Sequence, residues 1–328
     1  MTLRKISIRA KFIIIFTLLV VAVLSLTVCA WPISRHGAVA ARLGSASSSS
    51  ELETVMDAPG PITVETVVGA TWQVDRSGLI NLKHPKARAA GLVDGPEPIQ
   101  IFFHALRHPT RGLFLVDSGV EDALLNDPAH AALHGTLADA AHVDRLKIQI
   151  TTAAWLKAHA ETPQGVFLTH LHLDHVLGLP DVPSQAPIYA GPGETAERGG
   201  LNILMQPVID RALGAHGALQ TWSFAADPNA GFSGVLDVFG DGTLWALWVP
   251  GHTRGSVAFV VRTPKGPVLL TGDACHTAWG WKNGVEPGTF SEDIAESAHS
   301  LAELRALSAR HPQLDVRLGH QSLSGSAG

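Results

Sequence analysis

The sequence predicts an α/β fold, because short apolar runs typical of buried strands alternate with segments of helical periodicity. A second observation supports this class: histidine and aspartate side chains, which can bind metal ions, directly follow most of the apolar runs. In open α/β sheets, ligands bind beyond the carboxyl ends of the strands, so the order predicts a site at one sheet edge. The five predicted strands are residues 112–116, 165–168, 244–249, 267–270 and 315–318.

The chain begins with a membrane-type segment. Residues 1–11 contain basic but no acidic side chains, and residues 12–34 are uncharged and largely apolar. About 20 apolar residues can span a bilayer as a helix, whereas Val28-Cys29-Ala30 and Ala38-Val39-Ala40 resemble signal-peptidase sites. We therefore expect residues 1–34 to be a signal peptide or a single transmembrane anchor. Either places the rest of the chain in the periplasm or outside the cell, and an uncleaved segment 12–34 would hold it at the inner membrane.

Residues 35–57 are rich in Ala, Gly and Ser, a composition that predicts a flexible linker because it buries little apolar surface. Residues 58–328 then form one domain, long enough for a sizeable core. The net charge of −5, with interspersed signs, argues against a nucleic-acid partner. Cys275 is the only cysteine of this domain, so it has no disulfide partner there, and we expect a buried, inert thiol.

Helices are predicted between the strands. Residues 289–311 carry apolar side chains at the spacing of one buried helix face, with Thr289 and Glu292 placed as a capping box and Pro312 just past the end. Residues 144–159 and 196–213 also show helical periodicity, although Pro207 interrupts the second.

The motif that carries chemistry is Thr-His-Leu-His-Leu-Asp-His at residues 169–175, directly after a predicted strand. Later strands are followed by Pro-Gly-His252, Thr-Gly-Asp273 and Gly-His320, and the first strand by Asp117-Ser-Gly. Imidazole and carboxylate ligands suit zinc and its first-row neighbours, whereas magnesium and calcium prefer oxygen ligands. The sequence therefore predicts a transition-metal site assembled from distant segments.

This pattern resembles the metallo-β-lactamase superfamily over about residues 61–321. The resemblance implies a four-layer αββα sandwich with two zinc ions at one edge. It also implies a ligand set in which His170, His172 and His252 hold one ion, Asp174, His175 and His320 hold the other, and Asp273 bridges them.

The resemblance implies catalytic roles as well. A hydroxide bridging the two ions would be the nucleophile, because metal coordination lowers the pKa of water toward neutrality. Asp174 would orient the nucleophile and pass a proton to the leaving group. Asp117 would hydrogen-bond a ligand histidine and fix its tautomer.

Differences between this sequence and particular members of the superfamily restrict the substrate classes that we expect. His172 stands where flavodiiron members carry a Glu, which favours hydrolytic zinc, and the complete His-x-His-x-Asp-His set disfavours β-lactam hydrolysis. Residues 250–256 and 267–273 look most like the lactonases, so a zinc-dependent hydrolase of an ester-like bond, in a lactone such as an acyl-homoserine lactone, is expected. Two alternatives stay open: a phosphotriesterase or thioester hydrolase on the same core, and a membrane-tethered metal-binding module without turnover.

Substrate contacts are less specified by the sequence. The tyrosine that some lactonases place near the carbonyl has no counterpart, because Tyr189 lies in a different segment. His276 or a backbone amide could act as the oxyanion donor instead. Trp279 and Trp281 could line an apolar pocket for an acyl chain.

Overall fold

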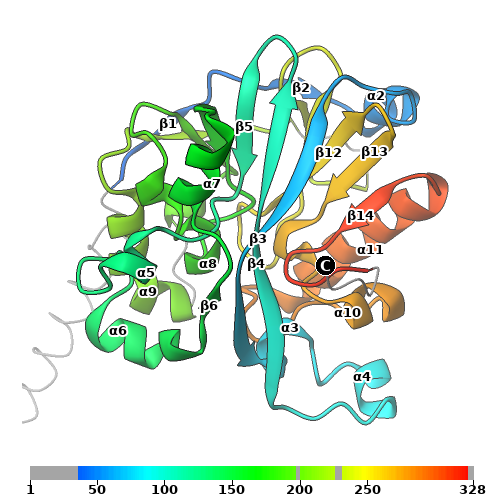
Figure 1. The fold of residues 1–328 in the computed structure, drawn as a ribbon. Helices are drawn as coiled ribbons and strands as arrows, with labels where there is room; N and C mark the ends of the chain where they lie inside the picture. The colour runs from blue at the N-terminus through cyan, green and yellow to red at the C-terminus, as the bar shows by residue number, and fades with distance from the viewer. Residues whose placement is uncertain (1–35, 197–199, 226–230, 324–328) are drawn as a thin grey trace, which may run out of the picture.

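The computed structural model describes residues 36–196, 200–225 and 231–323. Two mixed sheets form the framework of this part of the chain (Figure 1). The first sheet has the strand order β1-β9-β8-β7-β5-β4-β3-β6, and the second has the order β14-β13-β12-β11-β10-β2. Parallel and antiparallel neighbours occur in both sheets.

The first sheet consists of β1 (Ala38–Ala40), β3 (Thr63–Asp75), β4 (Pro96–His108), β5 (Gly112–Val116), β6 (Lys147–Ile148), β7 (Pro163–Phe167), β8 (Ile188–Ala190) and β9 (Leu219–Thr221). The second consists of β2 (Ser45–Ser47), β10 (Gly234–Asp237), β11 (Leu244–Trp248), β12 (Val257–Thr263), β13 (Gly266–Leu270) and β14 (Asp315–Arg317).

The helices are α2 (Ser49–Val55), α3 (Arg76–Leu79), α4 (Pro85–Ala89), α5 (Ala123–Asn126), α6 (Gly135–Ala140), α7 (Thr152–His159), α8 (Leu173–Val176), α9 (Gly200–Leu213), α10 (Ala278–Asn283) and α11 (Ile294–Arg310). Short 3-10 turns are η1 (Val143–Arg145), η2 (Leu179–Asp181), η3 (Glu194–Ala196) and η4 (Gly272–Ala274).

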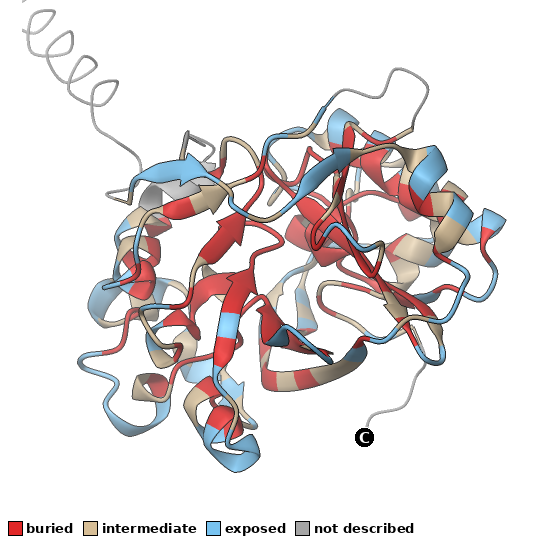
Figure 2. Ribbon diagram, turned by 90° about the horizontal axis from the view of Figure 1, so that it is seen from above, coloured by how far each residue is buried: buried red, intermediate tan, exposed pale blue. Residues whose placement is uncertain are grey.

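Three apolar clusters hold these elements in four layers. Between the sheets, Phe114 and Phe167 of the first pack with Phe259 of the second. The outer face of the first sheet packs against α7 and α9, and that of the second against α2 and α11. Figure 2 shows the buried residues concentrated along the strands, with exposed residues on the outer helices and loops. The predicted α/β class is confirmed, and the helix–sheet–sheet–helix order matches the expected αββα layering.

The predicted helix at 289–311 has a different start. The structure begins α11 at Ile294, and Asp293 caps it by accepting hydrogen bonds from the N–H groups of Ala295 and Glu296. The predicted capping box of Thr289 and Glu292 is therefore wrong. The backbone N–H of Thr289 donates to Ser77 O at 2.8 Å, which holds this segment against another loop instead of a helix.

The predicted helix at 144–159 is shorter than expected. Its α-helical part is α7, because residues 147–148 pair with β3 as β6. Within the other predicted helix, at 196–213, the described residues from Gly200 onward form α9, which keeps Pro207 inside it.

The N-terminal part of the chain differs from the predicted flexible linker. Within residues 36–57, β1 pairs with β9 in the first sheet and β2 pairs with β10 in the second. Ser48 then caps α2, with its side chain accepting from Glu51 N and the Glu51 carboxylate accepting from Ser48 N. Composition misled here because the serine run contains a capping box that starts a helix with buried apolar residues.

Helix α2 contributes to the hydrophobic core of the protein. Leu52 and Met56 are both fully buried in the cluster beneath α11. Replacing Leu52 with alanine is expected to lower the free energy of unfolding by about 2–5 kcal/mol. Urea denaturation measures the change, with the exposed Thr54→Ala on the same helix as control. Equal stability of the two variants would restore the linker interpretation.

No helix in the described residues is long and apolar enough to span a membrane. The predicted signal or anchor, residues 1–34, lies outside the described part of the chain. One of the two possible cleavage motifs, Ala38-Val39-Ala40, is strand β1. Cleavage after Ala40 would remove that strand from the sheet edge.

Candidate metal centre

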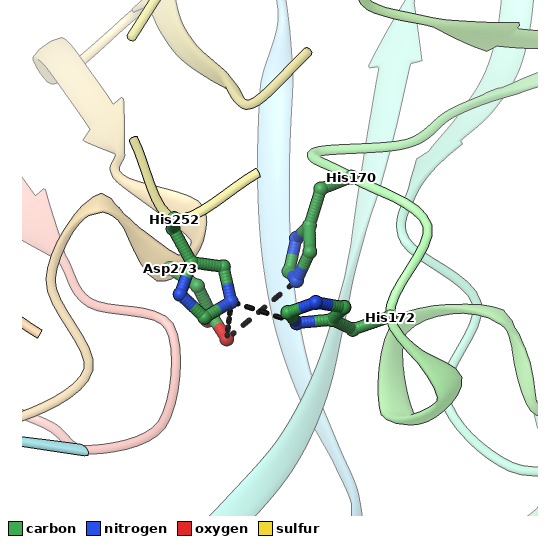
Figure 3. Close-up of side chains that lie close together, drawn as sticks. All are labelled: His170, His172, His252 and Asp273. Carbon is green, nitrogen blue, oxygen red and sulfur yellow. Dashed lines mark hydrogen bonds and ion pairs between the residues drawn. The ribbon is translucent and has the colours of Figure 1, made fainter. Parts of the chain in front are cut away.

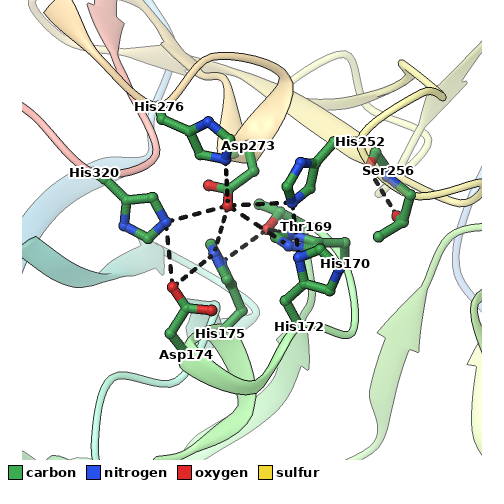
Figure 4. Close-up of polar contacts among 12 residues, drawn as sticks. Thr169, His170, His172, Asp174, His175, His252, Ser256, Asp273, His276 and His320 are labelled. Atoms are coloured by element: carbon green, nitrogen blue, oxygen red, sulfur yellow. Dashed lines mark hydrogen bonds and ion pairs between the residues drawn. The ribbon is translucent and has the colours of Figure 1, made fainter. Parts of the chain in front are cut away.

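The side chains predicted as metal ligands lie together at one edge of the two sheets (Figure 4). His170 and His172 follow β7, and the short helix α8 places Asp174 and His175 after them. The remaining three come from the second sheet: His252 follows β11, Asp273 lies in η4 after β13, and His320 follows β14. Residues as far apart in the sequence as His170 and His320 therefore lie in one cluster, because the strands before them end at the same edge.

The first group is formed by His170, His172 and His252 with Asp273 (Figure 3). His252 Nε2 lies 2.7 Å from His172 Nδ1 and 3.4 Å from Asp273 Oδ2. His170 Nε2 lies 3.7 Å from the same carboxylate oxygen. The ligand atoms of this group all lie within 4.8 Å of one another, as a common ion requires.

The second group is formed by Asp174, His175 and His320. Asp174 Oδ2 lies 3.2 Å from His320 Nε2 and 3.9 Å from His175 Nε2. Asp273 Oδ2 lies 3.1 Å from His320 Nε2 and 3.3 Å from His175 Nε2. The same oxygen therefore faces both groups, which is the position a bridging ligand needs.

Buried atoms without partners test whether these residues fit a metal pair. In the described part of the chain, Nε2 of His170, Nε2 of His175 and Oδ1 of Asp273 are buried without a hydrogen-bond partner. Such atoms are costly to bury unless they are satisfied. Their convergence with other imidazoles and carboxylates fits divalent first-row cations, zinc among them.

The electrostatics of the two groups differ. Burial and neighbouring imidazoles hold the pKa of His170 and of His252 well below the usual value, so these rings keep a free lone pair. Burial also lowers the pKa of His320, but the carboxylates of Asp273 and Asp174 together raise that pKa to about 9. The unprotonated imidazoles of the first group can bind a cation directly, whereas a cation at the second group would displace the proton of His320.

Asp117 supports the second group. It lies at the end of β5 with a positive φ of 57°, a conformation that Asp tolerates better than most residues. Its Oδ2 accepts a hydrogen bond from His175 Nδ1 at 2.8 Å, and its Oδ1 accepts one from Thr169 N at 2.8 Å. This leaves His175 Nε2 free to face the centre, the outer-shell geometry that orients a metal-binding imidazole.

Glu194 is a residue that the sequence did not reveal. It is buried in η3, and burial raises its pKa to about 7. Its Oε2 accepts a hydrogen bond from Leu171 N at 2.7 Å, between His170 and His172. Its Oε1 accepts from Thr253 Oγ1 at 2.5 Å and from Gly255 N at 2.9 Å, just after His252. Glu194 therefore ties together the two loops that carry the first group.

Glu194→Gln is expected to weaken zinc binding at the first group by about 10–100-fold, the usual cost of losing an outer-shell partner. A single amide oxygen cannot accept all three hydrogen bonds, so one loop is released. Competition titration with a zinc indicator measures the affinity. The matched control is Glu121→Gln, another buried carboxylate that accepts from a backbone N–H, that of Ala132. Equal zinc affinities in both variants would show that the hydrogen bonds of Glu194 to the two ligand loops do not affect metal binding.

A cavity of about 470 Å³ opens onto the cluster. His172, Asp174, His252, Asp273, His276 and His320 line one part of it. Its other walls include apolar side chains, namely Trp72, Val74, Leu79, Ile99, Leu173, Met205 and Phe290. The site thus combines metal-type ligands with an apolar chamber.

The sequence also predicted roles for Trp279, Trp281 and Cys275, which lie near the cluster in the chain. Trp279 and Trp281 do not line it: Trp279 packs against the first apolar cluster, and Trp281 lines a separate cavity with His104 and Arg317. The expected acyl-pocket role of these tryptophans is wrong, because neither side chain lines the cavity beside the cluster. Cys275 is buried, and burial raises the pKa of its thiol to about 12, as expected of an inert cysteine.

Comparison with known families and relatives agrees with this geometry. The sequence model of the metallo-beta-lactamase superfamily matches residues 105–320. A relative described as N-acyl homoserine lactonase AttM, from Azorhizobium caulinodans, is 30% identical over 223 residues, which is 65% of this chain and 78% of the relative. The AttM lactonase of Rhizobium johnstonii is 28% identical over 238 residues, which is 70% of this chain and 84% of the relative.

Solved structures give the same fold. A crystal structure described as a quorum-quenching N-acyl homoserine lactone lactonase has a TM-score of 0.58 at 18% identity, covering 81% of this chain and 94% of that one. AidC, described as a dizinc quorum-quenching lactonase, has a TM-score of 0.50 at 14% identity, with 81% and 90% covered. At these identities the likeness concerns the fold alone.

Proposed function

This chain belongs to the metallo-β-lactamase superfamily and is a metal-dependent hydrolase, and we propose that it opens the ring of N-acyl homoserine lactones or closely similar lactones. The observation that carries the proposal is the cavity, in which apolar walls adjoin the histidine and carboxylate cluster. A lactone ring at the cluster would leave room for an acyl chain against Trp72, Met205 and Phe290. The similarity to the AttM lactonases supports the same substrate class.

We assign the cluster two zinc ions, for both of which Asp273 would be a ligand. Bound there, the ions would act as Lewis acids that lower the pKa of water and polarise the carbonyl of the substrate. His170, His172 and His252 would hold one ion, and Asp174, His175 and His320 the other. Asp117 and Glu194 keep the ligand loops in place through the hydrogen bonds described above.

Asp174 has the further role of moving a proton. Its Oδ2 lies on the inner side of the cluster, 3.2 Å from His320 Nε2, and the residue also lines the cavity. A carboxylate at this place can take the proton of the attacking water and give it to the alkoxide that leaves when the ring opens.

A substrate panel tests this function. Purified protein is assayed with homoserine lactones of short, medium and long acyl chains, a thioester, an aryl phosphotriester and a β-lactam, each with and without a chelator. We expect the acyl lactones to have the highest kcat/KM, longer chains to bind with lower KM, and the chelator to abolish turnover.

Other outcomes of the panel would overturn the lactonase proposal in different ways. Preference for the phosphotriester or the thioester would assign the same core to that substrate class. Absence of turnover on every substrate, with metal bound, would favour a metal-binding module.

We also propose that the domain works outside the cytoplasm, exported or anchored by residues 12–34. The sequence pattern of basic, apolar and small residues supports this. Cell fractionation with N-terminal sequencing of the mature protein tests it. An intact N-terminus in the membrane fraction indicates an anchor, and a new N-terminus near Ala30 in the periplasm indicates a signal peptide. An intact chain in the cytoplasm would contradict export.

A further inference from the structure

His276 lies inside the cluster, although it is not one of the seven ligands assigned above. It follows Asp273 by three residues, is 1% exposed and lines the cavity. Its Nε2 lies 3.0 Å from Asp273 Oδ2 (Figure 4). Its ring stacks on that of His320 at 5.5 Å and lies edge-on to that of His252 at 4.9 Å. It therefore sits between the two groups.

The backbone fixes this position. The N–H of His320 donates to the carbonyl of His276 at 3.2 Å, and the N–H of Gly319 donates to the carbonyl of Cys275 at 3.0 Å. Ala278 N also donates to Gln321 Oε1 at 3.1 Å. These hydrogen bonds hold the segment after Asp273 against the segment that carries His320. The backbone therefore keeps the imidazoles of His276 and His320 next to each other.

The hydrogen bond on the far side of the ring decides what His276 can do. Its Nδ1 lies 3.0 Å from the carbonyl oxygen of Leu79, which can only accept, so Nδ1 carries the hydrogen. In the neutral ring this leaves a lone pair on Nε2, which points into the cluster and has no hydrogen-bond partner among the described residues. In this tautomer of the neutral ring, Nε2 therefore offers a lone pair to a cation, whereas an oxyanion donor would need a proton at Nε2.

A lone pair 3.0 Å from a carboxylate oxygen is unfavourable unless a proton lies between the two atoms or a metal cation lies beside both. We propose that His276 is a further metal ligand, which binds a cation through Nε2 together with Asp273 and His320. The ligand atoms of these three residues lie within 4.8 Å of one another. The centre then has six histidines, and the second cation has one more protein ligand than the family resemblance implied.

This inference rests on the metal centre proposed above, and zinc titration of the full-length protein separates the two. The variants are His276→Gln, which keeps the volume but removes the imidazole lone pair, and the control His216→Gln. His216 is also buried and hydrogen-bonded to a backbone carbonyl, that of Leu179, but lies away from the cluster. We expect His276→Gln to weaken one of two stepwise zinc affinities by at least about 10-fold, and the control to leave both unchanged.

Nitrogen NMR of the wild type, with ¹⁵N-labelled histidine, gives a second readout that does not depend on the folding of a variant. If His276 is a ligand, its Nδ1 stays protonated and its Nε2 signal moves away from the free, unprotonated position when zinc is added. An Nε2 signal unchanged by zinc, or one that carries a proton in the zinc-loaded protein, would overturn the inference. A wild type that binds no zinc would instead overturn the metal centre itself.

Discussion

Replacing Asp273 with asparagine is expected to abolish hydrolysis and to reduce the bound zinc from two ions per chain to one or none. Oδ2 of Asp273 faces both ligand groups, with Nε2 of His170, His175, His252, His276 and His320 between 3.0 and 3.7 Å away. The neutral amide would remove the negative charge that the two proposed cations share. Loss of several kcal/mol of transition-state stabilisation corresponds to a fall in kcat/KM of at least about 10³-fold.

The measurement combines elemental analysis with lactone turnover for Asp273→Asn. Asp315→Asn is the control, because this exposed carboxylate pairs with Arg317 away from the cluster. A variant that keeps two zinc ions and the activity of the wild type would show that Asp273 does not bridge the centre.

Asp174→Asn is expected to lower kcat by about 10²–10⁴-fold, the range typical of general acid–base catalysis. An asparagine oxygen can still approach a metal, but its amide cannot carry the proton between water and leaving group. The effect should depend on the leaving group. An alkoxide needs that proton to depart, whereas a thiolate, with a much lower pKa, does not.

Comparing a homoserine lactone with the matching thiolactone therefore isolates the role of Asp174. We expect the variant to lose far more activity on the lactone than on the thiolactone, with zinc content measured in parallel. An equal loss on both substrates would mean that Asp174 acts as a ligand only.

The candidate site could be predicted largely from sequence, because its ligand types are chemically specific and each follows a strand. Asp117, His252 and Asp273 are each preceded by a short apolar run that the structure forms as β5, β11 and β13, and His320 follows the short strand β14. Glu194 carried no comparable signal: it lies in a loop, and its role arises only when η3 packs between two ligand loops.

The fold was harder to predict where elements are not apolar runs. Strands β3 and β4 each extend over 13 residues, and β4 contains Pro, Glu, Gln and His among its apolar positions, so neither stands out as a buried strand. In residues 36–57 the serine-rich composition predicted a linker, whereas the capping box at Ser48 and the buried Leu52 form a helix. Average composition hides such local signals.

In the proposed centre, the Asp273 carboxylate and the histidines around it hold a pair of cations. Elemental analysis of the purified full-length protein, after zinc supplementation and removal of excess metal, measures how many ions it binds. We expect two equivalents of zinc per chain. A folded protein without stoichiometric transition metal would contradict it.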